Sequence, residues 1–368
     1  MDPLTVTGWT ASPAADESRW FTVEETSAAA GVRRGITAFA ERLGFTGGRL
    51  EQVRLAAAEA AAGLAEHASR GEMLVRIVRD GTVAALEFVC LDHGPGIADV
   101  ARSLVGGRST AAAPGLGLGA IERLADRSGL HSLPGAGTTL FARFRQPGDV
   151  AEAGVPADPP FAGLTRPIAG ETECGDAYAA IAGDGVVHAM LCDGLGHGTL
   201  AARAAREAVR AMRETALPAG PAAIVERIHR RLRPTRGGAV AVAVIAPGRR
   251  RIRYAGVGNI SGWIVHGDRR TGMISVPGIA GAGARIRERT YELPPGGTVV
   301  LHSDGLNGRW DPVARPGLFD RDPLLVAATL LRDAGSRHDD RSVLVVPTTP
   351  AAPAAPAAPA ASSAAGEG

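Results

Sequence analysis

The stretch CGDAYAAIAGDGVVHAMLCDGLGHG, residues 174–198, decides how the second half of this chain folds. Two apolar runs, 175–182 and 186–192, have the composition of β-strands. Asp176 stands at the start of the first run, and Asp193 ends the second, directly before a tight glycine loop. The pattern therefore predicts acidic side chains at one edge of a sheet.

Further carboxylates follow the same rule. Asp304 ends the apolar run of VVLHSDGLNG (299–308), and Asp339 and Asp340 precede the run of HDDRSVLVV (338–346). A single Asp-Gly pair is more simply a turn, but several such strand ends in one domain favour a common site. Packed carboxylates repel each other and lose hydration, and a hard divalent cation relieves both costs. Oxygen ligands favour magnesium or manganese over zinc, and two such ions can activate a bridging water.

The motifs CGDAY, CDGLGHG, GVGNI, SDGL and DDRSVLVV resemble the SpoIIE-type branch of the metal-dependent (PPM) protein phosphatases, over roughly residues 160–347. The resemblance implies an α-β-β-α sandwich with two Mn²⁺ or Mg²⁺ ions at one end of its sheets. It also implies attack of metal-activated water on phosphoserine or phosphothreonine, without a phosphoenzyme. The positions that match the family's metal ligands are Asp176, Asp193, the carbonyl of Gly194, Asp304 and Asp339, with Asp340 as a neighbour that could assist.

The N-terminal half carries a second set of motifs. AAAEAAAGLAEHA (56–68) places Glu59 on a helix, LDHGPGI (91–97) ends a strand, and GLGLGAIERLAD (115–126) opens a helix. Glycine-rich loops and helix N-termini suit phosphate groups, and an Asp at a strand end can accept a hydrogen bond from an adenine amino group. One glycine loop alone would be weak evidence, but the ordered set predicts a nucleotide site.

This set resembles the GHKL ATP-binding fold, in particular the anti-sigma-factor serine kinases that phosphorylate STAS-domain antagonists, over about residues 20–145. The resemblance assigns the general base to Glu59. It assigns adenine contacts to Asp92, Gly94 and Gly96, and the phosphate lid to Gly115, Gly117 and Gly119. The family places a magnesium-binding Asn four residues after the Glu, where this chain has Gly63. Glycine has no side chain to bind magnesium, so we expect nucleotide or partner binding rather than kinase activity.

The sequence thus predicts a two-domain α/β protein. We expect a flexible arm (1–20), a GHKL kinase-like ATP-binding domain (21–146), a linker (147–160), a SpoIIE-type phosphatase domain (161–347) and a disordered Ala/Pro tail (348–368). The linker and the tail are assigned from their Pro, Ala and Gly content.

The bulk composition limits the partners. A net charge of +2 and an aromatic content of 4% argue against nucleic-acid binding. The chain has no apolar run of about 18 residues and no leader pattern, so we expect no membrane partner and a cytoplasmic location.

We expect a bacterial signalling phosphatase acting on a phosphorylated STAS-domain protein of an anti-sigma/sigma-factor pathway, with a regulatory N-terminal domain. Three alternatives stay open: a bifunctional kinase–phosphatase, a non-catalytic anti-sigma-type binding protein, and a metal-dependent nuclease or small-molecule phosphatase.

Overall fold

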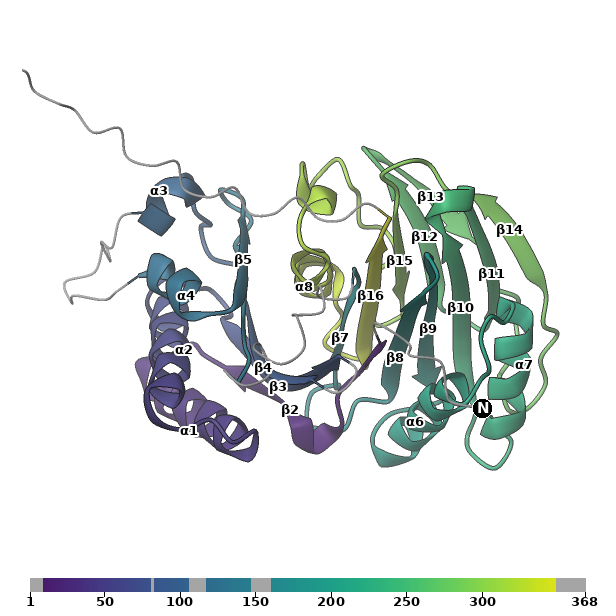
Figure 1. The fold of residues 1–368 in the computed structure, drawn as a ribbon, viewed down its shortest axis with the longest axis horizontal. Coiled ribbons are helices and arrows are strands. Elements are labelled where there is room, and N and C mark those ends of the chain that lie inside the picture. Colours follow the sequence, from purple (N-terminus) through teal and green to yellow (C-terminus); the bar gives the residue numbers. More distant parts are fainter. Residues whose placement is uncertain (1–8, 81–82, 106–116, 147–159, 349–368) are drawn as a thin grey trace, which may run out of the picture.

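The computed structural model describes residues 9–80, 83–105, 117–146 and 160–348. Gly115, the predicted linker except its last residue, and nearly all of the predicted tail lie outside these residues. The described elements form three β-sheets with helical layers beside and between them (Figure 1). None of the described helices is both long and apolar enough to cross a bilayer.

The N-terminal domain is an antiparallel sheet with helices on one face, in the strand order β2-β3-β4-β6-β5. Its strands are β2 (Ser18–Thr22), β3 (Glu72–Asp80), β4 (Val83–Leu91), β5 (Arg127–Ser132) and β6 (Thr138–Phe144). Its helices are α1 (Thr26–Arg42), α2 (Gly47–His67), α3 (Val100–Val105) and α4 (Leu118–Leu124). Strands β3 and β4 form an antiparallel hairpin with Asp80 opposite Val83.

The C-terminal domain is the predicted α-β-β-α sandwich. One sheet has the order β1-β8-β9-β10-β11-β14 and the other the order β13-β12-β15-β16-β7. The first sheet contains β1 (Trp9–Ala11), β8 (Asp176–Gly183), β9 (Val186–Gly194), β10 (Gly238–Ala246), β11 (Arg251–Val257) and β14 (Glu288–Glu292). The second contains β7 (Ala162–Arg166), β12 (Ser261–His266), β13 (Arg269–Met273), β15 (Thr298–His302) and β16 (Arg341–Pro347). Helices α6 (Thr199–Arg213) and α7 (Pro221–Leu232) cover the first sheet, and α8 (Pro323–Ala334) covers the second.

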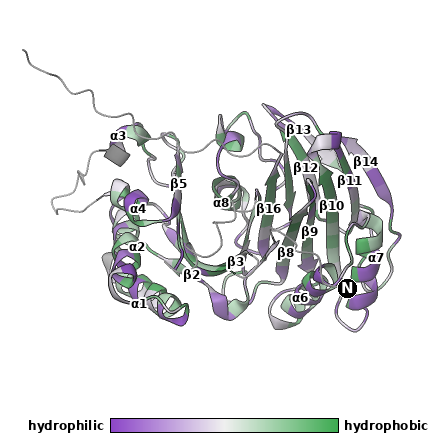
Figure 2. Ribbon diagram, in the orientation of Figure 1, coloured by the Kyte–Doolittle hydropathy of each residue, from purple (hydrophilic) through white to green (hydrophobic). Residues whose placement is uncertain are grey.

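The hydropathy of the elements follows this layering. The inner strands of the sandwich are strongly hydrophobic, whereas α1, α6 and α7 each present a hydrophilic face to solvent (Figure 2). The apolar core between the two sheets includes Tyr178, Leu191 and Val299. Burial of these side chains stabilises the sandwich by roughly 2 kcal/mol each.

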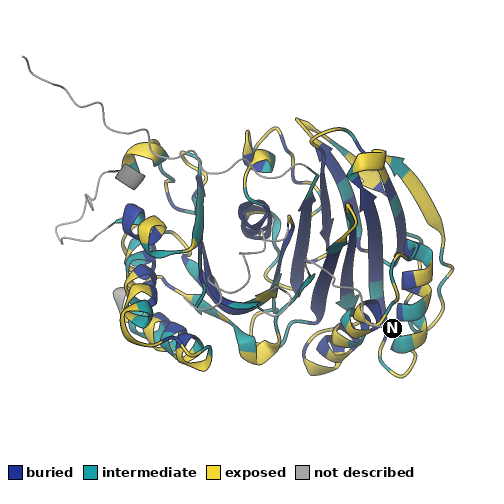
Figure 3. Cartoon of the chain, viewed as in Figure 1, coloured by how far each residue is buried: buried dark blue, intermediate teal, exposed yellow. Residues whose placement is uncertain are grey.

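Helix α8 is shared by both domains. Every residue from Pro323 to Arg332 is buried, and Figure 3 shows the helix buried between two sheets. On β4, Phe88 and Cys90 face the α1–α2 core, while Val89 and Leu91 join the core around α8. A strand with consecutive buried residues is covered on both faces. One face of β4 packs against α1 and α2, and the other packs against α8 of the C-terminal domain.

Polar contacts cross the same boundary. The buried Arg76 on β3 donates to the carbonyl of Gly163 at 2.8 Å and to the Tyr178 hydroxyl at 3.2 Å. The hydroxyls of Thr139 and Thr329 lie 3.1 Å apart, which joins β6 to α8. The two domains therefore form one packed body.

The predicted flexible arm differs from the structure where the structure describes it. Trp9, Thr10 and Ala11 form β1 and pair with β8 opposite Ile181, Ala180 and Ala179. The Arg213 guanidinium lies 5.7 Å from the centre of the Trp9 ring. Backbone pairing at an open sheet edge and this cation–π contact order a segment whose composition alone suggested a loose arm.

Candidate metal and nucleotide sites

Asp176 and Asp193 lie directly opposite each other on β8 and β9. Asp176 is 3% exposed, and neither of its carboxylate oxygens has a hydrogen-bond partner among the described residues. Burial raises the pKa of Asp176 to about 7, with further contributions from the charges of Asp340 and Asp339, although the nearby Ser303 and Ser342 hydroxyls oppose the rise. A buried, unpartnered carboxylate is costly, so this position favours a bound cation.

Asp193 and Asp304 extend the acidic cluster. Burial raises the pKa of Asp193 to about 9, and the charges of Asp176, Asp304 and Asp339 add to the rise. Burial and the Asp339 charge also raise the pKa of Asp304. Each of these shifts reports carboxylates that face one another in a poorly hydrated place. The strand ends therefore bring four predicted ligands together.

Asp339 and Asp340 have different surroundings. The charge of Asp339 raises the pKa of four other carboxyl groups, those of Asp176, Asp193, Asp304 and Asp340. Asp340 is 2% exposed and accepts hydrogen bonds from the backbone N–H groups of Ile168 at 2.8 Å and Gly175 at 2.9 Å. Asp339 thus belongs to the cluster of mutually repelling carboxylates, whereas Asp340 holds the 168–175 segment, which leads into Asp176, through two backbone hydrogen bonds.

Two glycines allow the loops to approach this closely. A Cβ at Gly194 would stand 2.3 Å from the Ala201 carbonyl oxygen, and one at Gly305 would stand 1.9 Å from the Asp340 carbonyl oxygen. These separations exclude any side chain. The Gly residue after Asp193 and the one after Asp304 therefore serve backbone packing at the cluster.

Sequence reasoning assigned no role to Asn259, which the structure places in the cluster. Its Nδ2 donates to Asp304 Oδ2 at 2.6 Å. The residue follows β11 inside the GVGNI motif, so an amide at a third strand end was the available signal. We infer that Asn259 orients the Asp304 carboxylate.

The donor set fits a hard divalent cation. It consists of carboxylate oxygens, one of them a buried Asp176 without partners, which is the chemistry that Mg²⁺ and Mn²⁺ prefer. As the side chains stand, no group of three or more His, Cys, Asp or Glu residues in the described part of the chain could already hold a metal ion. Like-charged carboxylates repel one another, so their side chains would have to rotate to bring their oxygens onto one ion.

The nucleotide-site residues also converge in part. The backbone N–H of Gly117, at the start of α4, donates to Glu59 Oε2 on α2 at 3.1 Å. Asp92 Oδ1 accepts the N–H of Gly94 at 2.6 Å. Gly96 has φ +70°, and a Cβ there would stand 2.1 Å from the Leu133 carbonyl oxygen. The start of α4 thus meets Glu59 of α2, and Gly119 is buried in α4.

Gly63 lies four residues after Glu59 on α2, and a Cβ built there meets no atom within 4 Å. The space that an Asn side chain would need is therefore open. This observation agrees with a missing magnesium ligand rather than with a helix that packs too tightly for one.

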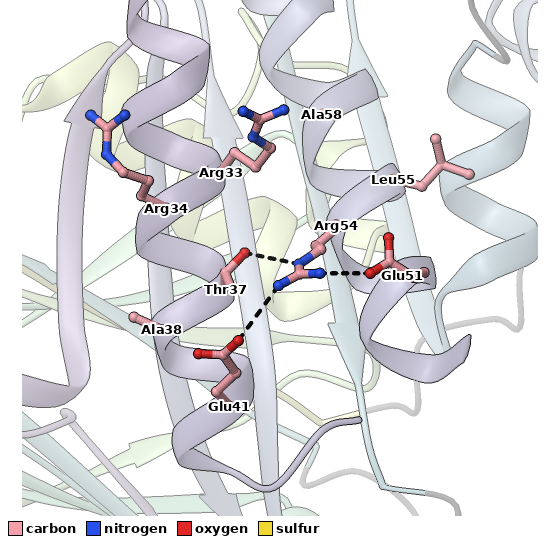
Figure 4. Close-up of a pocket in the computed structure, with 9 residues that line it drawn as sticks. All are labelled: Arg33, Arg34, Thr37, Ala38, Glu41, Glu51, Arg54, Leu55 and Ala58. Atoms are coloured by element: carbon pink, nitrogen blue, oxygen red, sulfur yellow. Dashed lines mark hydrogen bonds and ion pairs between the residues drawn. The ribbon is translucent and has the colours of Figure 1, made fainter. Parts of the chain in front are cut away.

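A groove between α1 and α2 lies apart from both sites (Figure 4). Arg54 crosses it and bonds to Thr37 at 3.2 Å and Glu51 at 2.6 Å, while Arg33 and Arg34 extend from α1. None of the predicted site residues lines this groove.

Comparisons with known proteins match the two domains separately. The family described as Stage II sporulation protein E (SpoIIE) matches residues 183–349, and the histidine kinase-like ATPase domain matches residues 21–144. The serine/threonine-protein kinase RsbT of Bacillus subtilis is 34% identical over 105 residues, which cover 28% of this chain and 77% of RsbT. The phosphoserine phosphatase RsbX of Bacillus subtilis is 26% identical over 141 residues, which cover 38% of this chain and 70% of RsbX. A solved structure described as "The bacterial stressosome: a modular system that has been adapted to control secondary messenger signaling" shares 29% identity, covers 50% of this chain and 97% of its own, and superposes with a TM-score of 0.47.

Proposed function

Because this chain belongs to the SpoIIE family of serine phosphatases through its C-terminal domain and to the RsbT-like kinase-type ATPases through its N-terminal domain, we propose that it removes phosphate from serine or threonine of a signalling protein. The observation that carries the proposal is the buried, unpartnered Asp176 facing Asp193 across two strands. A cation between or beside the two carboxylates would remove their repulsion and replace the hydration that they have lost.

We assign the metal site to Asp176, Asp193, Asp304 and Asp339, with the Gly194 carbonyl as a further oxygen. Two Mn²⁺ or Mg²⁺ ions held there would supply an activated water and neutralise charge on the phosphoryl group. Asn259 orients Asp304 through the 2.6 Å hydrogen bond. Asp340 positions the 168–175 segment rather than binding the ion, because both of its oxygens already accept backbone N–H groups.

The proposed substrate is a phosphorylated STAS-domain protein or a related switch protein. Two features support this choice: the relative RsbX is a phosphoserine phosphatase, and the N-terminal domain is related to RsbT, a serine/threonine kinase. A kinase-type domain and a phosphatase joined in one chain would recognise the same partner. This assignment rests on family analogy.

The proposed role of the N-terminal domain is regulation by ATP. Arg332, on the buried α8, donates to the carbonyl oxygen of Asp92 at 3.1 Å. Two residues further on, Ala334 accepts the N–H of Asn307 at 2.7 Å, and Ser336 donates to Gly305 at 2.7 Å. The strand end that would contact adenine is thus two contacts away from the Asp304 loop, so ordering of the Asp92 loop by a nucleotide would be felt at the metal site.

The test of phosphatase function measures hydrolysis of p-nitrophenyl phosphate and of a phosphoserine STAS-domain protein with Mn²⁺, Mg²⁺ or EDTA. We expect metal-dependent turnover that is lost in Asp193→Asn and Asp304→Asn. Asp184→Asn is the matched control, because Asp184 lies in the turn at the other end of the β8–β9 hairpin. Absence of both turnover and Mn²⁺ binding in the folded protein would overturn the proposal and favour a non-catalytic binding protein.

The test of regulation compares Arg332→Met with Arg315→Met. Both arginines bond to Asp333, but only Arg332 reaches Asp92. We expect ATP to change the phosphatase rate in the wild type and in Arg315→Met, and to have less effect in Arg332→Met. Equal rates with and without ATP, in a protein shown to bind it, would refute regulation. Transfer of phosphate from ATP to a STAS-domain partner, abolished by Glu59→Ala, would instead support the bifunctional alternative.

A further inference from the structure

Three exposed side chains border the acidic cluster: Leu195, Arg236 and Ile279, which we call the rim. Leu195 is 50% exposed and Ile279 is 36% exposed. Only six large apolar side chains are this exposed among the described residues, and Leu195, Leu200 and Ile279 are on segments next to the carboxylate edge. Single exposed apolar residues are ordinary, but their grouping at a reaction site calls for a partner.

Gly237 holds the rim together. Its carbonyl oxygen accepts the N–H of Leu195 at 3.0 Å, and a Cβ at Gly237 would stand 2.8 Å from Ile279 Cγ2. The next residue, Gly238, pairs with Gly194 on β9 and exchanges backbone hydrogen bonds with Ala280 at 3.1 and 2.9 Å. Leu195 therefore follows Asp193 by two residues, and Ile279 is held next to the same strand end through the Ala280–Gly238 backbone hydrogen bonds.

Arg236 supplies the charged part of the rim. A Cβ at Gly196 would stand 3.2 Å from Arg236 Nη1, so the guanidinium lies over the loop that follows Asp193. Arg236 is exposed, and no ion pair to it is found within the described part of the chain. Other exposed arginines of this domain, such as Arg233 and Arg251, also form no ion pair within the described residues, and Arg236 differs from them by its place over the loop after Asp193. An unpaired guanidinium over the loop that follows Asp193 is available to an anion that enters with the substrate.

The charge balance of the reaction identifies that anion. Two divalent cations would offset four carboxylates, and a phosphoserine then brings about 1.5 to 2 further negative charges. A guanidinium matches phosphate geometry through parallel N–H donors. Leu195 and Ile279, on either side of Gly237, offer apolar contact to the residue next to the phosphoserine.

We propose that the rim is the recognition surface for the substrate: Arg236 binds the phosphoryl oxygens, and Leu195 with Ile279 binds an apolar side chain that flanks the phosphorylated serine or threonine. This inference rests on the proposed phosphatase function and narrows its substrate class to phosphorylated segments with an apolar neighbour. The charged contact of Arg236 and the apolar contacts of Leu195 and Ile279 can be tested separately.

The test of the apolar part uses two phosphoserine peptides of equal length, with leucine or with serine on both sides of the phosphoserine. We expect the full-length protein with Mn²⁺ to prefer the leucine peptide by about five- to tenfold in kcat/KM, since burial of one apolar side chain gives discrimination of this order. The preference should fall to about twofold or less in Leu195→Ser and Ile279→Ser. Leu55→Ser is the matched control, because Leu55 is 39% exposed on α2 of the other domain and should keep the full preference.

The test of Arg236 measures kcat/KM for both peptides and competitive inhibition by inorganic phosphate. We expect Arg236→Ala to lower kcat/KM for both peptides on the order of 10- to 100-fold and to weaken phosphate inhibition, because a hydrogen bond to a charged group contributes this much. Arg236→Lys should recover part of the loss. Arg33→Ala, on the exposed face of α1 (Figure 4), should match the wild type.

The outcomes separate this inference from the proposed function. Metal-dependent turnover without flank preference, or with normal phosphate inhibition in Arg236→Ala, would overturn the rim and leave the phosphatase standing. Absence of turnover on both peptides and on p-nitrophenyl phosphate would overturn both.

Discussion

Asp339 and Asp340 are adjacent, yet the structure predicts opposite consequences for their removal. In Asp340→Ala, the N–H groups of Ile168 and Gly175 lose the carboxylate that accepts them at 2.8 and 2.9 Å. A hydrogen bond to a charged group contributes about 1.5–3 kcal/mol. Relief of the buried charge returns part of this, because burial raises the pKa of Asp340. We therefore expect a loss of about 3 kcal/mol in the free energy of unfolding, which is roughly 4 °C in Tm for a chain of this size.

In Asp339→Ala, the main change is the loss of a negative charge that repels four neighbouring carboxyl groups and raises their pKa values. The one hydrogen bond lost is from the Asp340 N–H at 2.9 Å. These effects have opposite signs, so the metal-free stability should stay within about 1 kcal/mol of the wild type. The increase in Tm on adding Mn²⁺ should disappear, because stabilisation by a ligand depends on its affinity for the folded protein.

The assay is thermal unfolding followed by circular dichroism, in EDTA and over a series of Mn²⁺ concentrations. Asp340→Ala should have a lower Tm in EDTA and still respond to Mn²⁺, whereas Asp339→Ala should have a normal Tm in EDTA and no response. The reverse pattern would refute the assignment of Asp339 to the ion and Asp340 to the backbone.

Three more predictions concern stability and the nucleotide site. Asp176, with a pKa raised to about 7 against an unfolded value near 4, binds its proton more tightly when folded, so on this account the metal-free protein should be most stable below about pH 4 and lose about 4 kcal/mol as pH rises to about 7; urea titrations in EDTA should show this loss, and Asp176→Asn should show a smaller one, because the raised pKa of Asp193 acts in the same direction. Gly63→Asn should let Mg²⁺ strengthen ATP binding, measured by calorimetry, while Gly63→Ala should only stabilise α2, by up to about 1 kcal/mol; an equal Mg²⁺ effect in both variants would contradict this. Arg76→Met should lower the free energy of unfolding by about 3 kcal/mol, because Glu87 is fully buried and would keep only Arg143 as a partner; a change below about 1 kcal/mol in denaturant unfolding would contradict it.

The strand ends of the C-terminal domain could be predicted because their signals are local. Apolar runs that end at an Asp followed by glycine predicted β9 and β15, an apolar run that begins at Asp176 predicted β8, and the register then places Asp176 opposite Asp193. The different roles of Asp339 and Asp340 could not be predicted from their sequence neighbours. Their separation depends on two N–H groups, of Ile168 and Gly175, that lie more than 160 residues away in the chain.

The N-terminal arm was misjudged for a related reason. Residues 9–11 form a strand of only three residues, which is stable only where an open edge such as that of β8 is available, and residues 18–20 begin β2, which pairs with β3. Such short pairing depends on the strand that it pairs with, so the sequence of residues 9–11 alone does not predict it.

The sequence of helix α8 indicates not only a helix but one that is buried on all sides. The run PLLVAATLLRDA has no polar face over its first nine residues, apart from Thr329. A helix that is apolar all round is buried on every side, yet an α-β-β-α sandwich exposes the outer face of its outer helices, as α6 and α7 do. The apolar outer face of α8 therefore has to pack against a second layer, and among the described residues the sheet of the N-terminal domain provides this layer through Val89, Leu91 and Phe141. If this reasoning holds, the phosphatase domain expressed without residues 1–146 should expose an apolar strip along α8 and bind a hydrophobic dye, and Leu325→Lys, on that strip, should reduce dye binding by the isolated domain while destabilising the full-length chain.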